Sequence, residues 1–219
     1  MDEDITIIDT NTRNEKIKNF FIKNKKKLII IFSIIAILLI GYFSFNEINK
    51  RNKIKLANLY NSIIIDYNLN GSDVSSKENI TKDLTFLINK QDATYSPLAL
   101  YFIIDNNLID NRNEINELFD TLIDKTKLDL EIKNLIIYKK ALFNSDFINE
   151  NDLIYTLSPI INSESIWKSH ALYLIAEYFY SDNQKNKAKE FYKKILLLSK
   201  ANNDIKIQTQ KRLNRDLSE

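Results

Sequence analysis

The chain has 219 residues, a net charge of +2 at pH 7, no cysteine, and only two glycines and two prolines. Without cysteine it can form neither a disulfide nor a Cys-ligated zinc site, and its balanced charge argues against nucleic-acid binding, which needs a concentrated basic face. An all-β fold of this length would use more Gly and Pro at its turns. We therefore predict an all-α protein.

Residues 1–27 form the first predicted segment. Residues 1–11 are short and polar, and we expect them to be loose. Thr12 and Glu15 have the spacing of a capping box, in which each side chain satisfies a free backbone N–H at a helix start. No Gly or Pro follows until Gly41. The pattern predicts one helix that begins near Thr12 and runs into the next segment.

Residues 28–45 read LIIIFSIIAILLIGYFSF and contain no charged side chain. A helix needs about 20 apolar residues to cross the hydrocarbon core of a bilayer, and this stretch lies at the lower edge of that range. Lysine stems at its ends can lengthen the span by snorkelling. We predict a transmembrane helix here, in preference to a buried helix of a soluble protein.

A cleaved signal peptide is the other interpretation of this stretch. It requires a short basic leader, an apolar core of roughly 7–15 residues and a small-residue cleavage site. Here 27 residues precede a longer core, and Tyr42 to Phe45 after Gly41 have no A-x-A pattern. We therefore expect an uncleaved anchor.

Basic residues surround the apolar stretch on both sides, with a larger number before it. The positive-inside rule places the more basic side in the cytoplasm. The N-terminal segment 1–27 is therefore predicted to be cytoplasmic and residues 46–219 to form an extracytoplasmic domain. The basic residues before the stretch are Arg13, Lys16, Lys18, Lys23, Lys25, Lys26 and Lys27, and those after it are Lys50, Arg51, Lys53 and Lys55.

Helical periodicity predicts four helix pairs in residues 46–219. The first pair joins a helix over 56–67 to a helix over 80–88. A turn at 68–73, which contains Gly71, separates them, and Ser75 and Glu78 after the turn form a capping box. The other pairs are 98–108 with 113–123, 128–143 with 152–157, and 166–180 with 185–199. A last amphipathic helix over 205–217 is predicted to cover the exposed end.

Two prolines serve as boundary signals. Ser96 and Pro97 predict a helix start, with Ser as the N-cap and Pro at the first helical position, where its missing N–H costs nothing. Pro159 is predicted to end the second helix of the third pair.

The fourth pair has the spacing of a tetratricopeptide repeat. Ala176 and Ala188 occupy the small positions of the two helices, and Phe179 and Tyr192 occupy aromatic positions. Leu172 and Ile195 stand where the signature often has Trp and Ala. One helix pair cannot bury its apolar face alone, so stacked pairs are expected to share a continuous core. We predict a tetratricopeptide-like α-solenoid of helical hairpins.

Residues 12–26 read T-R-x-E-K-I-K-x-F-F-x-x-N-K-K, and the chain closes with the fourth pair and a final helix. In these features the chain resembles the bacterial YfgM-type family of tetratricopeptide proteins, which are ancillary subunits of the Sec translocon. It differs where Gln210 and Lys211 replace the family's Arg-Ala. The resemblance implies an inner-membrane anchor, repeats in the periplasm, and action with a periplasmic chaperone on secretory chains.

Several residues are candidates for a functional site, and a structural role is favoured for each. His170, the only histidine, lacks the partners of a metal site or a triad, and Trp167 is expected to be a packing anchor. The acidic residues Asp146, Glu150 and Asp152 lack the Gly and spacing of a calcium loop. The aromatic residues expected in the core are Tyr178, Phe179, Tyr180, Phe191 and Tyr192.

The sequence shows no catalytic, cofactor-binding or metal-ligating set, so we expect a protein that is not an enzyme and has no cofactor. The expected function is protein–protein interaction at the translocon, with translocon subunits, a periplasmic chaperone or secretory chains as partners. The alternative is a structural scaffold in cell-envelope assembly or division. No nucleic-acid partner is expected.

Overall fold

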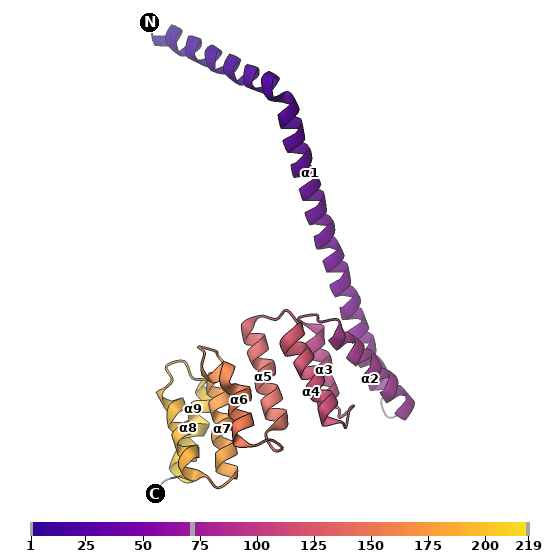
Figure 1. The fold of residues 1–219 in the computed structure, drawn as a ribbon, viewed down its shortest axis with the longest axis vertical. Helices are drawn as coiled ribbons and strands as arrows, with labels where there is room; N and C mark the ends of the chain where they lie inside the picture. The colour runs from indigo at the N-terminus through magenta and orange to yellow at the C-terminus, as the bar shows by residue number, and fades with distance from the viewer. Residues whose placement is uncertain (1, 71–72, 218–219) are drawn as a thin grey trace. The chain divides into compact units, whose positions relative to one another are not determined.

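The computed structural model describes residues 2–70 and 73–217, with side chains from residue 14 onward. The chain divides into two compact units, Met1–Lys55 and Leu56–Glu219. Within the described ranges every regular element is a helix (Figure 1), so the all-α prediction is confirmed.

The first helix, α1, spans Asp2–Asn70. It begins ten residues before Thr12, so the predictions of a loose segment over 1–11 and of a helix start at Thr12 are wrong. No Gly or Pro precedes Gly41, and nothing in the sequence therefore stops the helix from extending to its N-terminal end. The turn predicted at 68–73 does not begin at residue 68, since Asn68–Asn70 are still part of α1. Gly71 lies outside the described residues.

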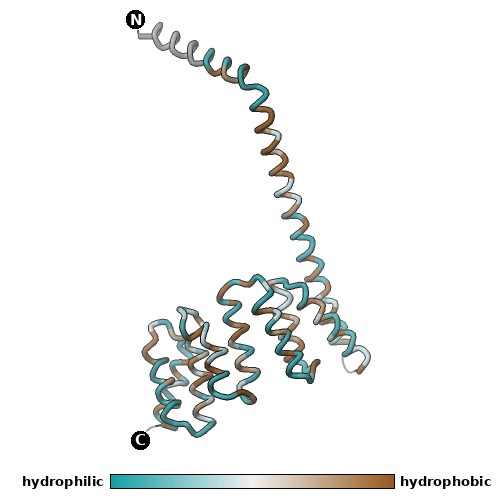
Figure 2. Tube along the Cα trace, in the orientation of Figure 1, coloured by the Kyte–Doolittle hydropathy of each residue, from teal (hydrophilic) through white to brown (hydrophobic). Residues whose placement is uncertain are grey.

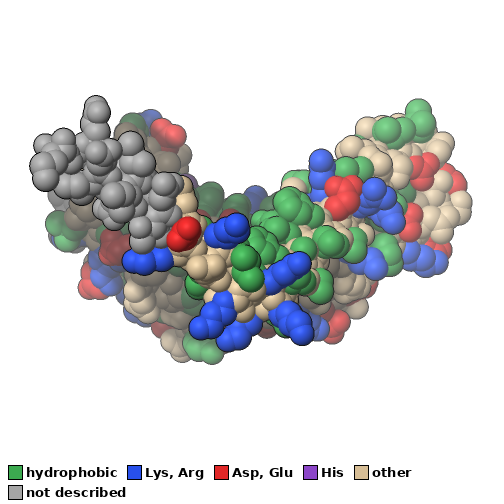
Figure 3. All heavy atoms as spheres, turned by 90° about the horizontal axis from the view of Figure 1, so that it is seen from above, with side chains coloured by type: hydrophobic (Ala, Val, Ile, Leu, Met, Phe, Trp, Pro, Cys, Tyr) green, Lys and Arg blue, Asp and Glu red, His purple; other side chains and the backbone are tan. Residues whose placement is uncertain are grey.

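The apolar stretch of α1 is exposed from residue 29 to residue 45, and Figure 2 shows it mostly in brown. Its large hydrophobic side chains between Ile29 and Phe45 are 46–68% exposed. A core helix of a soluble protein would bury such residues, so that interpretation is excluded for the described structure. Figure 3, a view of one face of the whole molecule, shows hydrophobic side chains in green beside Lys and Arg side chains in blue. The helix is consistent with a single-pass membrane anchor or a signal sequence.

The second unit begins with the end of α1 and continues through eight α-helices among the described residues, packed in sequential pairs like a solenoid of hairpins. A π-helical segment, η1 (Thr121–Lys125), extends α4. The eight helices are α2 (Val74–Asn89), α3 (Tyr95–Asp105), α4 (Arg112–Asp120), α5 (Leu130–Asn144), α6 (Glu150–Ile161), α7 (Lys168–Ser181), α8 (Lys185–Leu197) and α9 (Asn203–Arg215).

Hydrogen bonds between successive hairpins repeat at a regular sequence distance. In the C-terminal half most of them join residues 33–37 positions apart, close to a repeat of about 34 residues, and the bond from Tyr178 to Ile148 joins residues 30 apart. In the N-terminal half three such bonds join residues 27–31 apart, and the bond from Lys140 to Asp120 joins residues 20 apart. The earlier hairpins are therefore shorter than the later ones, which explains why the repeat signature is clear only in the fourth pair.

Two buried clusters form the core of the second unit, and α5 contributes to both. Ile136 lies in the cluster that includes α2, α3 and α4, whereas Ile137 lies in the cluster that includes α6, α7 and α8. Ile123 of η1 packs against both clusters. The two clusters therefore adjoin at α5 and η1.

Two capping predictions are wrong in detail. The helix α3 begins at Tyr95, and the carboxylate of Asp92 accepts hydrogen bonds from the backbone N–H groups of Thr94 and Tyr95. Ser96 is fully buried inside the first turn, where its Oγ donates to the carbonyl of Leu87 at 2.8 Å. Ser96 therefore links α3 to α2 instead of capping α3.

The helix α2 begins at Val74, directly after Asp73, so the predicted capping box at Ser75 is also wrong. Ser75 donates its hydroxyl hydrogen to the Asp73 carboxylate, and Glu78 pairs with Lys82 at 2.9 Å. Ser75 is the second residue of α2 and does not precede it, so its hydroxyl is not in the N-cap position that the capping box requires.

Pro159 lies inside α6 and does not end it. Proline removes only its own bond to the carbonyl four residues earlier, and here that loss falls in the last turn of the helix. Leu157 and Ile160 on either side are fully buried. Their burial against the core holds the turn in place, and the helix continues to Ile161.

Candidate protein-interaction surface

An aromatic cluster joins the first helices of the third and fourth hairpins. Tyr138 of α5 stacks on Trp167, with ring centroids 6.2 Å apart and an interplanar angle of 16°. The indole Nε1–H of Trp167 donates to the carbonyl of Glu131 at 3.0 Å, and the Glu131 carboxylate accepts from the hydroxyl of Ser165 at 2.7 Å. Trp167 thus anchors α7 to α5, and the packing prediction for this residue is confirmed.

His170 lies in the same cluster. Its ring centroid is 5.2 Å from that of Trp167 and 6.0 Å from that of Tyr138. Its Nδ1 is buried and has no hydrogen-bond partner among the described residues. Burial lowers the pKa of His170 below its ordinary value of 6.5, so a neutral packing residue fits this environment.

The other aromatic residues of the fourth hairpin fall into two groups. Phe179 and Tyr192 are almost completely buried, as the prediction requires. Tyr178, Tyr180 and Phe191 are partly buried and pack against the same core cluster. The hydroxyl of Tyr178 donates to the carbonyl of Ile148 at 3.1 Å, which ties α7 to the connection before α6.

A groove of about 450 Å³ lies between the α5–α6 connection and α7, and we call it the acidic groove. It falls within the range of about 300–1,000 Å³ found for ligand pockets, although it is open to solvent. Three of its lining residues are carboxylates, and Ile148 and Leu174 add apolar surface. The lining residues are Ser145, Asp146, Ile148, Leu174, Glu177, Tyr178, Ser181 and Asp182.

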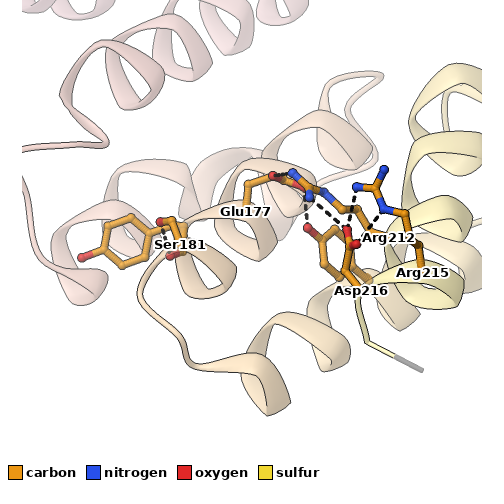
Figure 4. Close-up of polar contacts among 7 residues, drawn as sticks. Glu177, Ser181, Arg212, Arg215 and Asp216 are labelled. Atoms are coloured by element: carbon orange, nitrogen blue, oxygen red, sulfur yellow. Dashed lines mark hydrogen bonds and ion pairs between the residues drawn. The ribbon is translucent and has the colours of Figure 1, made fainter. Parts of the chain in front are cut away.

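Glu177 connects the acidic groove to the end of the solenoid (Figure 4). Its carboxylate accepts two hydrogen bonds from Arg212 of α9 and one from the hydroxyl of Tyr192. Burial opposes ionisation of Glu177, but these hydrogen bonds outweigh it, so its pKa lies below the ordinary value. Hydrogen bonds from Arg215 and then Arg212 lower the pKa of Asp216 to about 2.

The three acidic residues that the sequence suggested for a cation are directed to different partners. Glu150 binds Lys187 at 2.9 Å, and Asp152 accepts from the Asn149 side chain at 2.8 Å. Asp146 lines the acidic groove. Within the described residues, no three His, Cys, Asp or Glu side chains are placed to hold a metal ion.

Two further positions bear on the interaction surface. Lys139 of α5 is exposed, with its Nζ 5.5 Å from the ring centroid of Tyr101. Asn183 is exposed in the α7–α8 turn and has a φ of 58°, a left-handed conformation that Asn tolerates better than most residues. Both side chains are therefore accessible to a partner.

Sequence reasoning missed the polar side chains that link the hairpins. Glu131, Glu177 and Arg212 look like ordinary exposed helix residues in the sequence. The sequence feature that could have identified them is the number of residues between each one and its partner. Glu131 and Trp167 are 36 residues apart, and Glu177 and Arg212 are 35 apart. These distances are close to one repeat, so pairs at that spacing become neighbours once the hairpins stack.

No family model, curated protein or solved structure matches this chain. The fold itself defines an all-helical protein in which a long apolar helix is followed by packed helical hairpins.

Proposed function

We propose that this chain is a non-enzymatic, membrane-anchored protein-interaction module that assists protein secretion at the Sec translocon and links it to a periplasmic chaperone. The observation that carries the proposal is the union, in one chain, of an exposed apolar helix with a solenoid of hairpins. The helix suits a bilayer, and stacked hairpins offer an extended surface for protein partners.

The proposed location is the bacterial inner membrane, with the N-terminus in the cytoplasm and the repeat domain in the periplasm. The exposed hydrophobic side chains of 28–45 support this, because they need an apolar surrounding that water does not provide. An anchor is favoured over a cleaved signal sequence because no A-x-A cleavage pattern follows Gly41.

The proposed binding surface includes the acidic groove. It combines carboxylates, hydroxyls and apolar side chains, so it suits a polypeptide segment that carries a basic and an apolar residue. Such a groove offers modest affinity by itself, because a bound segment must be ordered. Confinement at the membrane raises the local concentration of partners and offsets that loss.

The translocon is proposed as the site of action because both ends of the chain resemble the YfgM-type family. The Thr12–Lys26 motif precedes the apolar stretch, and the closing repeat leads into α9. The solenoid arrangement is compatible with the repeat domain of that family, and the same arrangement would serve an envelope scaffold.

Detergent pull-down of the full chain followed by mass spectrometry tests the proposal. Translocon subunits and a periplasmic chaperone should be enriched, and an Asp146→Lys, Asp182→Lys double variant should lose them by reversing charge in the acidic groove. A matched control is Asp110→Lys with Asp124→Lys, which makes the same charge change at exposed positions outside the groove. Consistent recovery of division or wall-synthesis proteins would instead support the scaffold alternative.

A further inference from the structure

Charge is divided unequally along the second unit. Residues 56–184 contain ten Lys and Arg against nineteen Asp and Glu, whereas residues 185–219 contain ten against four. The last hairpin helix and α9 therefore form a basic end on an otherwise acidic domain. Such asymmetry points to an anionic partner for the basic end.

A row of lysines lies along α8. Lys185, Lys189 and Lys193 follow one another at intervals of four residues, which places them on one face of the helix. The next position in the row is Leu197, which is 85% exposed, and Lys200 follows it by three residues. We call these five residues the lysine row.

The lysine row flanks the face of α8 that packs against the core, so Lys189 is half-buried while the other members of the row are exposed. Ala188, Tyr192 and Ile195 are fully buried and hold the helix against α7. By contrast, the Leu197 side chain is more exposed than any other large hydrophobic side chain among the described residues. Folding of the domain does not account for a leucine in that position.

No acidic side chain neutralises the lysine row among the described residues. None of its lysines lies within 4.0 Å of a carboxylate, although the neighbouring Lys187 binds Glu150 at 2.9 Å. Glu190 is the only acidic residue between positions 183 and 203. The positive charge of the row is therefore available to an external anion.

We propose that the lysine row docks the repeat domain on the surface of an anionic phospholipid bilayer. Lysines beside an exposed leucine are typical of interfacial membrane binding, in which the ammonium groups meet lipid phosphates and the apolar side chain enters the headgroup boundary. Each lysine near such a surface raises the binding constant about fivefold, so Lys185, Lys189 and Lys193 together raise it on the order of 100-fold.

A bilayer is favoured over other anionic partners because the same chain carries a helix suited to one. The proposal rests on the anchor part of the proposed function, since the apolar stretch brings the lysine row into the neighbourhood of lipid. It is independent of the translocon assignment. Docking would fix the orientation of the domain, and hence the direction in which the acidic groove meets its partners.

The test uses the full chain reconstituted in vesicles. Because the chain has no cysteine, Ser199→Cys provides a single labelling position beside Leu197 and Lys200. A fluorophore there should be quenched by nitroxide-headgroup lipid in vesicles of phosphatidylcholine mixed with phosphatidylglycerol, and much less in phosphatidylcholine alone. Salt at about 0.5 M should remove most of the difference, since it shortens the Debye length to a few ångströms.

A variant with Lys185→Gln, Lys189→Gln and Lys193→Gln should reduce the quenching to its level in neutral vesicles. The control variant, Lys77→Gln with Lys90→Gln and Lys127→Gln, changes the same charge at exposed lysines elsewhere and should leave the quenching unchanged. Equal quenching in both lipid mixtures, or equal loss in both variants, would overturn the proposal.

Two readouts distinguish lipid docking from self-association and from the action of the anchor. If protection of the label grows with protein density and not with phosphatidylglycerol, a second copy covers the lysine row and the proposal is wrong. Extraction of the vesicles with alkaline carbonate reports on the anchor alone. A chain that resists extraction but shows no lipid-dependent quenching would refute the docking while leaving the anchor in place.

Discussion

Arg212 of α9 holds Glu177 of α7 by two parallel hydrogen bonds, from Nη2 to Oε2 at 2.6 Å and from Nε to Oε1 at 2.9 Å. Both side chains are less than one-third exposed. A planar guanidinium matches a carboxylate in this arrangement, so the pair fixes the angle of α9 as well as its position. The final helix is thereby attached to the hairpin that it covers.

Replacing Arg212 by Met should destabilise the repeat domain by about 1–3 kcal/mol, because Glu177 loses its charged partner while it stays partly buried. Chemical denaturation of a fragment comprising residues 47–219 measures the change, and amide exchange should show α9 exchanging faster than α7. Arg215→Met is the matched control, since that side chain is 74% exposed and its ion pair is worth little. Equal destabilisation by the two variants would contradict the assigned role of Arg212.

Acid should destabilise the domain through His170. Burial lowers its folded pKa, so as the pH falls below about 6.5 the unfolded chain binds a proton that the folded chain resists. Stability should therefore decrease from this pH downward, until the folded histidine is also protonated. The melting temperature of fragment 47–219, followed by the emission of Trp167, measures the effect.

The control for this prediction is His170→Gln, which removes the titrating group. Its melting temperature should fall less between about pH 7 and pH 5.5 than that of the unchanged fragment, because histidine is the side chain that ordinarily titrates in this window. Parallel pH profiles of the two proteins would show that His170 is not the group responsible.

Local periodicity in the sequence predicts the helices and their pairing, because each depends on residues close together in the chain. The spacing of Ala188, Tyr192 and Ile195 places them on one face of α8, and all three are buried. Local signals fail where a distant group competes. Ser96 resembles an N-cap, but the backbone N–H groups of Thr94 and Tyr95 at the start of α3 donate to Asp92, and Ser96 bonds to the end of α2.

The candidate surface could not be predicted from local sequence. The acidic groove exists only because the α5–α6 connection lies against α7, and its Glu177 is shared with Arg212 from the next element. Such contacts depend on how the hairpins stack, which the sequence shows only as a repeat length. The residues beside Pro159 likewise gave no sign in the sequence that burial would carry α6 past the proline.

Ala188→Leu should overpack the contact between α7 and α8 and cost about 1–3 kcal/mol, because Ala188 and Ala176 are both fully buried in one cluster. The melting temperature of fragment 47–219 measures the change. The structure also identifies the right control. Lys187 binds Glu150, so Asn186→Leu, at an exposed position, is preferable. A leucine at 186 as damaging as one at 188 would contradict the register of the hairpin.

Alkaline phosphatase fused after Glu219 should be active in bacterial cells. The basic residues before the apolar stretch outnumber those that follow it, which favours a cytoplasmic N-terminus and an extracytoplasmic domain. The matched measurement is a fusion at the same position in a chain whose Lys23, Lys25, Lys26 and Lys27 are replaced by Gln, which should lower the activity by weakening the bias. An inactive but stably expressed fusion on the unchanged chain would refute the orientation.

The apolar helix and the repeat domain should be needed together for interaction with partners. A photo-crosslinker at the exposed positions Lys139 or Asn183 should capture a translocon subunit, a chaperone or a secretory chain in whole cells. A version that lacks residues 1–46 and is exported by a cleavable signal should give much less of the same product. The tether confines the domain to the membrane where such chains emerge, which favours contact without adding any new one.

The comparison depends on equal amounts of the two proteins outside the cytoplasm, so immunoblots of the exported fractions must accompany it. Crosslinker at Asn186, an exposed position on α8, tests whether capture is particular to the surface around Lys139 and Asn183. Equal capture by the anchored and released versions would mean that the helix only directs the protein to its compartment. Capture of division or wall-synthesis proteins alone, at several positions, would support the scaffold alternative, because a solenoid surface would then serve assembly and not secretion.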